Sequence, residues 1–176
     1  ISPQGHALAS PVTLRRNEWR LALAPGEPII EVHIATGSPM DYDACGASFR
    51  QAEAFFPRYF PDKPFRAFTC HSWLLDPQLE RLLPPASNLV RFQRETYLYP
   101  LPGSSGDMPW QVRRPEDRDG RGPREMTTMQ RAFYEHVERG GRFFGGGCFL
   151  LPEDLDWGKQ AYRRQDLSRF GLFPRS

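Results

Sequence analysis

The sequence predicts an α/β (α+β) domain, a mixed sheet with helices on its faces. Two apolar segments, residues 29–34 and 65–73, have the composition of strands. Between them, residues 41–56 repeat apolar side chains at helical spacing, which predicts a connecting helix. Further strand and helix patterns follow along the chain. This order favours a mixed sheet over an all-β or all-helical fold.

Length and charge narrow the class of protein. The chain has 176 residues, 39% hydrophobic and 25% charged, which fits one globular domain with a sizeable core. A net charge of +2 does not point to a nucleic-acid or membrane partner. We see no apolar stretch long enough to span a bilayer and no signal peptide. The widely spaced Cys45, Cys70 and Cys148 favour reduced thiols in a cytoplasmic protein.

The composition also suggests how the chain is divided. We expect residues 1–10 to be a linker from an upstream domain of the same polypeptide. The main domain then covers residues 11–152, with a flexible loop rich in Gly, Pro, Asp and Arg at 102–124. Residues 153–176 form a polar tail, with a short helix near residues 159–168.

The first elements are a hairpin and a strand. Residues 12–14 and 19–23 predict a short β-hairpin, and residues 29–34 predict a strand. In that strand the even-numbered residues share one face, while Glu31 and His33 share the other.

The next elements are bounded by prolines and capping residues. Asp41 is the expected N-cap of the helix at 41–56, which Pro57 and Pro61 should end. After the strand at 65–73, Asp76 and Pro77 predict the start of a short helix that ends near residue 84.

The second half of the chain predicts two more strands around a helix. Residues 88–98 alternate in polarity and predict the longest strand, in an antiparallel or edge position. Thr127 and Gln130 form a capping box for a helix that ends at Gly140. Residues 142–151 predict the last strand, weakened by three consecutive glycines.

Polar residues in the two central strands are the candidates for chemistry. Glu31 or His33 would be a general base toward an amine or a hydroxyl, or the two form a satisfied polar pair on a partly wet sheet face. The turn at residues 35–40 offers backbone N–H groups to a phosphate, or is an ordinary strand-to-helix turn. Trp73 is either a core residue or one wall of a ligand groove.

Strand alternation separates Cys70 from its neighbour His71, which points to the opposite face. This argues against a Cys–His dyad, so a hydrolase that uses Cys70 is the least favoured reading. Glu31, His33 and His71 lack the usual zinc-ligand spacing, and we expect no metal. The arginines of residues 113–124 alternate with acids, which indicates a solvated loop and no nucleic-acid groove.

Several segments together resemble a bacterial acyltransferase family with a GNAT-like C-terminal domain. The most specific is Cys-His-Ser-Trp-Leu-Leu-Asp-Pro at residues 70–77. Supporting matches are Pro-Ile-Ile-Glu-Val-His-Ile at 28–34, Gly-Ser-Pro-Met at 37–40, Val-Arg-Phe-Gln at 90–93 and Gly-Gly at 140–141. The resemblance spans about residues 12–152.

The resemblance implies a GNAT fold, whose mixed, mostly antiparallel sheet has a central splayed pair of parallel strands, here residues 29–34 and 65–73. It implies transfer of an acyl group from acyl-CoA (acetyl-CoA or longer) to an amine of a small-molecule or peptide acceptor. The implied base is Glu31 or His33, with His71 assisting. The implied CoA-binding residues are Ile34, Ala35, Thr36, Gly37, Ser38 and Trp73.

Two departures from the GNAT pattern stand out. The usual phosphate loop, Arg/Gln-x-x-Gly-x-Gly/Ala, is absent from the turn at residues 35–40. No tyrosine follows the second strand, where the usual general acid lies, so Tyr97 or Tyr99 would replace it only if the fold brings one near. The alternative to an enzyme is a non-catalytic acyl-CoA-binding or protein-interaction module.

Overall fold

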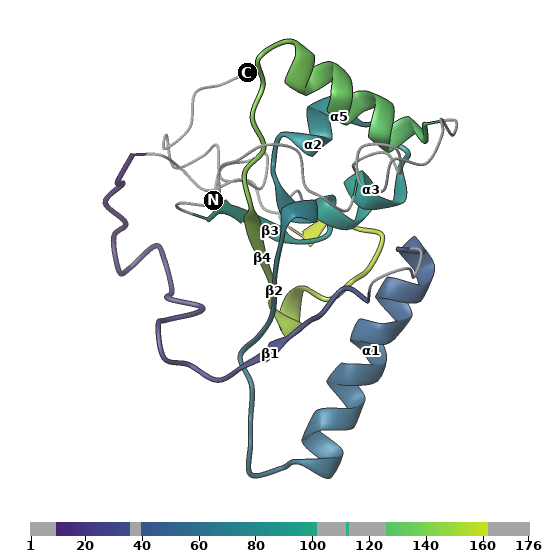
Figure 1. Ribbon diagram of the computed structural model, residues 1–176. Helices are drawn as coiled ribbons and strands as arrows, with labels where there is room; N and C mark the ends of the chain where they lie inside the picture. Colours follow the sequence, from purple (N-terminus) through teal and green to yellow (C-terminus); the bar gives the residue numbers. More distant parts are fainter. Residues whose placement is uncertain (1–9, 36–39, 102–111, 113–125, 162–176) are drawn as a thin grey trace.

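The computed structural model describes residues 10–35, 40–101, 112 and 126–161. Within these residues a sheet has the strand order β1-β2-β4-β3 (Figure 1). Its strands are β1 (Ile29–Glu31), β2 (Ala67–Ser72), β3 (Tyr97–Pro100) and β4 (Gly146–Leu150). β1 and β2 are parallel, and the other pairs are antiparallel. The predicted mixed, mostly antiparallel sheet with a parallel strand pair is therefore confirmed.

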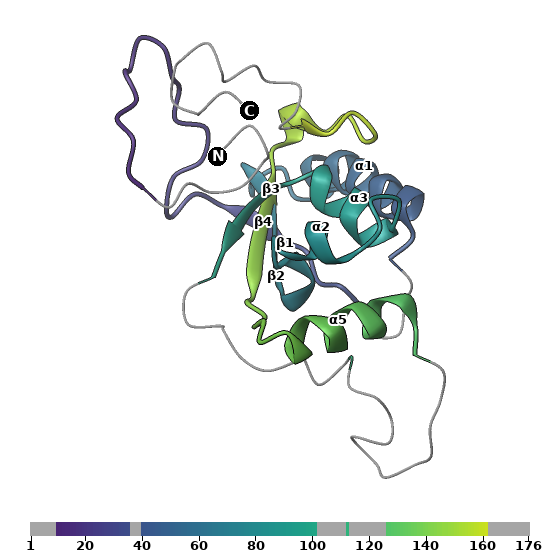
Figure 2. The ribbon, with the colours of Figure 1, turned by 90° about the horizontal axis from the view of Figure 1, so that it is seen from above.

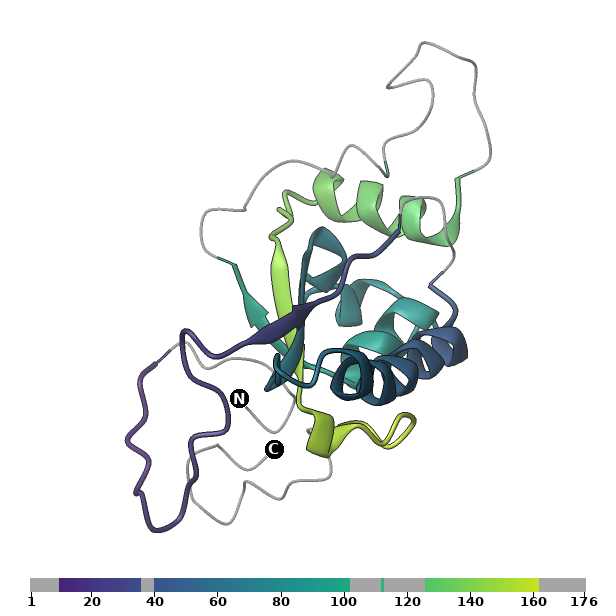
Figure 3. The same cartoon turned by 90° about the horizontal axis from the view of Figure 1, so that it is seen from below.

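Helices cover one face of this sheet. They are α1 (Tyr42–Tyr59), α2 (Leu79–Leu82), α3 (Asn88–Arg94) and α5 (Thr128–Glu138), with 3-10 turns η1 (Trp73–Leu75) and η3 (Pro152–Asp154). α1, α2 and α3 lie on one side of the strands, whereas residues 10–28 lie on the other (Figures 2 and 3). The main core forms where Phe49 of α1 and Phe92 of α3 pack on Phe68 and Cys70 of β2.

The predicted hairpin at residues 12–14 and 19–23 is wrong. These residues form no strand, although a turn at Arg15 persists through hydrogen bonds to the N–H groups of Glu18 and Trp19. Val12 and Leu21 are 44% and 77% exposed, so the segment has no apolar face against the core. A two-stranded hairpin without such packing is marginal in water.

The predicted long strand at residues 88–98 is also wrong, because its first part is the helix α3. The Ser87 hydroxyl accepts a hydrogen bond from the N–H of Val90 and caps the helix. Leu89, Val90, Phe92 and Gln93 are buried, a spacing that fits one face of a helix, whereas a strand would direct neighbouring residues to opposite faces. Only the last two residues of the predicted strand are extended, as the start of β3 (Tyr97–Pro100).

The helix α1 begins as predicted but ends later. The Asp41 carboxylate accepts a hydrogen bond from the N–H of Ala44 at 2.8 Å, which confirms the N-cap. The helix continues through Pro57 to Tyr59. A proline in the last turn removes a single helical donor, and the N–H of Phe60 still bonds to the Phe56 carbonyl.

The strand β1 is shorter than predicted, and it is an edge strand of the described sheet. The N–H of Val32 bonds to the Thr69 carbonyl at 2.7 Å, and beyond it the chain leaves β2. This separation fits the expected splay of the two parallel strands. The capping box of Thr127 and Gln130 is confirmed, and Gly140 ends α5 with φ of 79°.

Two predictions lie largely outside the described residues. The tail helix at 159–168 is described only to residue 161, and the loop at 102–124 only at Val112. Val112 is 3% exposed and packs with Phe133 of α5 in a second core cluster.

Candidate active site

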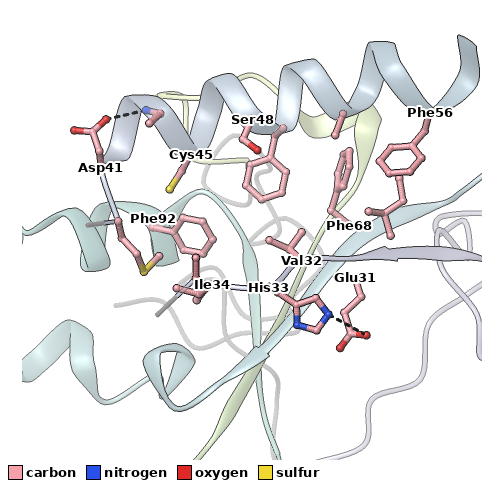
Figure 4. A pocket seen from close by; sticks show the side chains of 16 residues that line it. Glu31, Val32, His33, Ile34, Asp41, Cys45, Ser48, Phe56, Phe68 and Phe92 are labelled. Carbon is pink, nitrogen blue, oxygen red and sulfur yellow. Dashed lines mark hydrogen bonds and ion pairs between the residues drawn. The ribbon is translucent and has the colours of Figure 1, made fainter. Parts of the chain in front are cut away.

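A cavity of about 500 Å³ lies between β1 and α1 (Figure 4). On the β1 side Ile30, Val32 and Ile34 face it, the set that strand alternation assigns to one face. Phe68 of β2 and Phe92 of α3 supply further apolar wall. The cavity is therefore a concave site with mainly apolar walls.

The sequence of α1 explains why the cavity stays open. Ala44, Ser48 and Ala52 follow one another at intervals of four residues, so they stack on a single face of the helix. Their short side chains leave room toward β1. One turn later the large side chain of Phe56 takes the same face, which ends the cavity toward the carboxyl end of α1. Ala44 and Ser48 are exposed, so the cavity opens to solvent there.

The opposite face of β1 carries polar groups. Figure 4 shows the side chains of Glu31 and His33 directed away from α1, while Val32 and Ile34 point toward it. Glu31 Oε2 lies 3.9 Å from His33 Nε2, and Glu31 Oε1 lies 3.9 Å from Nδ1 of His71 on β2. The side chain of His33 is 83% exposed, and those of Glu31 and His71 are 54% and 44% exposed. The structure thus brings the three predicted catalytic residues together.

A fourth residue joins this group from β3. The Tyr99 hydroxyl lies 2.8 Å from His71 Nε2. Tyr99 was named from the sequence only as a conditional substitute for the missing tyrosine, because contact between non-adjacent strands is not visible in local sequence. Tyr97, the other conditional choice, instead donates a hydrogen bond to Asp154 Oδ2 at 2.8 Å.

Only some of the predicted CoA-binding residues line the cavity. Ile34 and Ala35 line the cavity, while Thr36, Gly37 and Ser38 lie outside the described residues. Trp73 does not line it and packs edge-on against Phe133, with ring centroids 6.0 Å apart. This contact supports the interpretation of Trp73 as a core residue.

The thiols are unsuited to nucleophilic attack. Burial, with a smaller contribution from the negative charge of Glu31, raises the pKa of the Cys70 thiol to about 11. Cys70 is 2% exposed and packs in the main core, on the α1 side of the sheet, whereas the exposed His71 faces Tyr99 and Glu31. Burial also raises the pKa of Cys45, which lines the cavity, with a smaller contribution from Asp41.

Part of the motif at residues 70–77 is structural. Asp76 is 1% exposed, and its carboxylate accepts hydrogen bonds from the N–H groups of Gln78 and Phe144 at 2.9 and 2.8 Å. A side chain at Gly146 would overlap the Leu75 carbonyl, so β4 packs directly on η1. These contacts hold the segment that follows His71.

The described residues contain no group of three His, Cys, Asp or Glu side chains placed to hold a metal ion. None of their helices has the length and apolar character needed to cross a membrane.

Known structures with bound decanoyl-CoA or CoA resemble this fold. A crystal structure of an acyltransferase in complex with decanoyl-CoA is 29% identical, with a TM-score of 0.55, covering 75% of this chain and 43% of that one. An acyltransferase in complex with CoA and 10C-teicoplanin is 24% identical, with a TM-score of 0.52 and coverage of 72% and 41%. At that identity the second comparison supports the fold alone.

The chain thus spans about two fifths of the length of these acyltransferases. A search of curated protein sequences finds no match. The family model described as the GNAT-like C-terminal domain matches residues 6–150. The chain therefore belongs to the family of GNAT-like C-terminal domains, as the motifs of the sequence indicated.

Proposed function

We propose that this chain is the acyl-CoA-binding part of an N-acyltransferase, which transfers an acyl group from acyl-CoA to an amine. The observation that carries the proposal is the placement of an apolar cavity and a carboxylate on the two sides of one strand. Ile30 and Val32 of this segment line the cavity, whereas the Glu31 carboxylate is directed away from α1 and lies 3.9 Å from Nδ1 of His71. A relative that is 29% identical binds decanoyl-CoA, which supports an acyl-CoA donor.

The cavity fits the acyl chain of the donor. Its volume of about 500 Å³ lies within the range of small-molecule sites, and its walls are mainly aliphatic and aromatic. Each buried methylene contributes about 0.8 kcal/mol of transfer free energy. Affinity should therefore increase with acyl length until the chain reaches Phe56, at the closed end of the cavity.

The nucleotide part of CoA would lie near the start of α1. Ile34 and Ala35 lead into this region, and together with Thr36, Gly37 and Ser38 they remain our predicted cofactor-binding residues. The Asp41 carboxylate already occupies the N–H of Ala44. A phosphate would therefore bind to the turn that precedes the helix, because the negative charge of Asp41 opposes an anion at the helix end itself.

The proposed reaction is direct attack of an amine on the thioester. The amine nitrogen forms a bond to the carbonyl carbon, the carbon–sulfur bond breaks, and CoA leaves as a thiolate that takes up a proton. Glu31 is the base that accepts the proton of the amine. The side chain of Glu31 is 54% exposed, against 83% for His33, and an ionised carboxylate can only accept hydrogen bonds.

Calorimetric titration with decanoyl-CoA, acetyl-CoA and free CoA tests the donor site. We expect decanoyl-CoA to bind most tightly. Ser48→Phe fills the cavity and should weaken decanoyl-CoA more than acetyl-CoA, while Ala54→Phe, an equally large change at an exposed position outside the cavity lining, should leave both affinities unchanged. If Ser48→Phe weakened the binding of both donors equally, the acyl chain would not lie in this cavity.

Release of CoA in the presence of a panel of primary amines tests catalysis. Amine-dependent release above the rate without amine supports the transferase. Chain-length-dependent binding without any release would favour a non-catalytic acyl-CoA-binding module.

A further inference from the structure

We propose that Tyr99 is a positioning residue, which holds His71 in the tautomer that carries its hydrogen on Nδ1 and thereby orients Glu31 as the base. This inference rests on the proposed function, because it assigns a role to a neighbour of the proposed base.

The contact depends on one glycine. His71 of β2, Gly147 of β4 and Tyr99 of β3 lie in one row across the sheet, as the strand registers show. Tyr99 and His71 are thus separated by a whole strand. A side chain at Gly147 would overlap the ring of Tyr99, so only glycine lets this ring extend over β4 to His71. The ring centroids of Tyr99 and His71 are 6.1 Å apart.

The donors and acceptors of the row determine the tautomer. Burial raises the pKa of Tyr99, which keeps its hydroxyl protonated near neutral pH and able to donate. A phenol can donate or accept, and we assign the hydroxyl as the donor and His71 Nε2, 2.8 Å away, as the acceptor. In a neutral imidazole the hydrogen must therefore be on Nδ1, which faces Glu31 Oε1 at 3.9 Å.

This arrangement distinguishes between the candidate bases. His71 Nε2 is bonded to the Tyr99 hydroxyl, whereas its Nδ1 faces Glu31 Oε1 at 3.9 Å, an electrostatic contact beyond hydrogen-bond distance. Glu31 Oε2 points away from His71, toward the exposed His33 at 3.9 Å. Because His33 is 83% exposed and His71 44%, we assign the more open Oε2 side to the amine, with His71 Nδ1 facing the other oxygen.

The test compares Tyr99→Phe with Tyr97→Phe in the complete 176-residue chain. Tyr99→Phe removes the hydroxyl at His71 and keeps the ring. Tyr97→Phe removes the neighbouring hydroxyl of the same strand, which contacts Asp154 and not His71. The tautomer is measured by ¹⁵N NMR of the imidazole groups, with His71→Gln to assign the signals.

We expect Nδ1–H in the wild-type chain and in Tyr97→Phe, and a mixture of tautomers in Tyr99→Phe. With decanoyl-CoA and an amine, kcat of Tyr99→Phe should fall by about 3- to 10-fold, the loss of one hydrogen bond, with KM for decanoyl-CoA unchanged. A KM effect without a kcat effect would contradict a role in orienting the base.

The two readouts separate this inference from the proposed function. An unchanged His71 tautomer in Tyr99→Phe overturns the inference whatever the activity. An altered tautomer with unchanged kcat overturns the positioning role. An altered tautomer in a chain that shows no turnover with any amine supports the contact and overturns the proposed function alone.

Discussion

The two faces of the parallel strand pair β1 and β2 differ in what holds them in place. The face toward α1 is buried by packing. Phe68 is 1% exposed, and its ring centroid lies 5.2 Å from that of Phe49 and 5.0 Å from that of Phe65. The opposite face is partly exposed and is connected by polar contacts, with Glu31 3.9 Å from two histidines. Packing contributes stability in proportion to buried area, whereas exposed polar contacts contribute little.

This difference indicates that one short strand separates binding from chemistry. Because side chains alternate, neighbouring residues such as Val32 and Glu31 face a cavity and a polar row respectively. We therefore expect substitutions on the α1 side to affect folding and donor affinity. Substitutions on the polar side should affect turnover and leave the fold intact.

The largest effect is expected from Glu31→Gln. This isosteric change removes the base, and turnover should fall by roughly 10²- to 10⁴-fold with no change in the unfolding midpoint. The measurements are amine-dependent CoA release and denaturant unfolding. Glu53→Gln removes the same charge from an exposed position of α1 and should retain the wild-type rate. A wild-type rate in Glu31→Gln would remove Glu31 from the mechanism.

Phe68→Ala should have the largest effect on stability. The side chain is fully buried in the main core, and its truncation leaves a cavity that costs about 3–5 kcal/mol in the free energy of unfolding. Equilibrium unfolding in urea measures this loss. A loss of less than about 1 kcal/mol would mean that the packed face is not the source of stability that we infer.

The buried thiols on the packed face predict a loss of stability at alkaline pH. Burial raises the pKa of Cys70 to about 11 and that of Cys148 to about 12, from an ordinary value of 9.0. Above about pH 9 the unfolded chain therefore binds fewer protons than the folded one, so the free energy of unfolding falls as pH rises. The double variant Cys70→Ala, Cys148→Ala should flatten this decrease in urea unfolding between about pH 8 and 10. If the decrease in the free energy of unfolding with pH were unchanged in this variant, groups other than the two thiols would cause it.

His33→Ala should have the smallest effect. Its side chain is 83% exposed, and its contact with Glu31 at 3.9 Å is of the surface type, worth up to about 1 kcal/mol, or roughly fivefold in rate. The steady-state rates of His33→Ala and Glu31→Gln, measured under the same conditions, give the difference between the two effects. A loss as large as that of Glu31→Gln would make His33 the base instead.

Local sequence predicted best the elements whose signals are themselves local. The Asp41 cap and the Thr127–Gln130 capping box are such signals, and both are present. The prediction of a strand at residues 88–94 is wrong because their buried positions follow helical spacing, and the Ser87 side chain caps the helix. The apolar periodicity of α1 was found, yet Pro57 did not end it.

The amino-acid sequence by itself determined the mixed α/β class, the family and the opposite faces of Glu31 and Val32, because motif, composition and the two-residue period of a strand are local properties. Only the tertiary structure decided that Tyr99 reaches His71 and that Trp73 packs against Phe133. These contacts depend on the order of strands in the sheet and on the absence of a side chain at Gly147. Strand order is set by the packing of the whole chain, which no local pattern specifies.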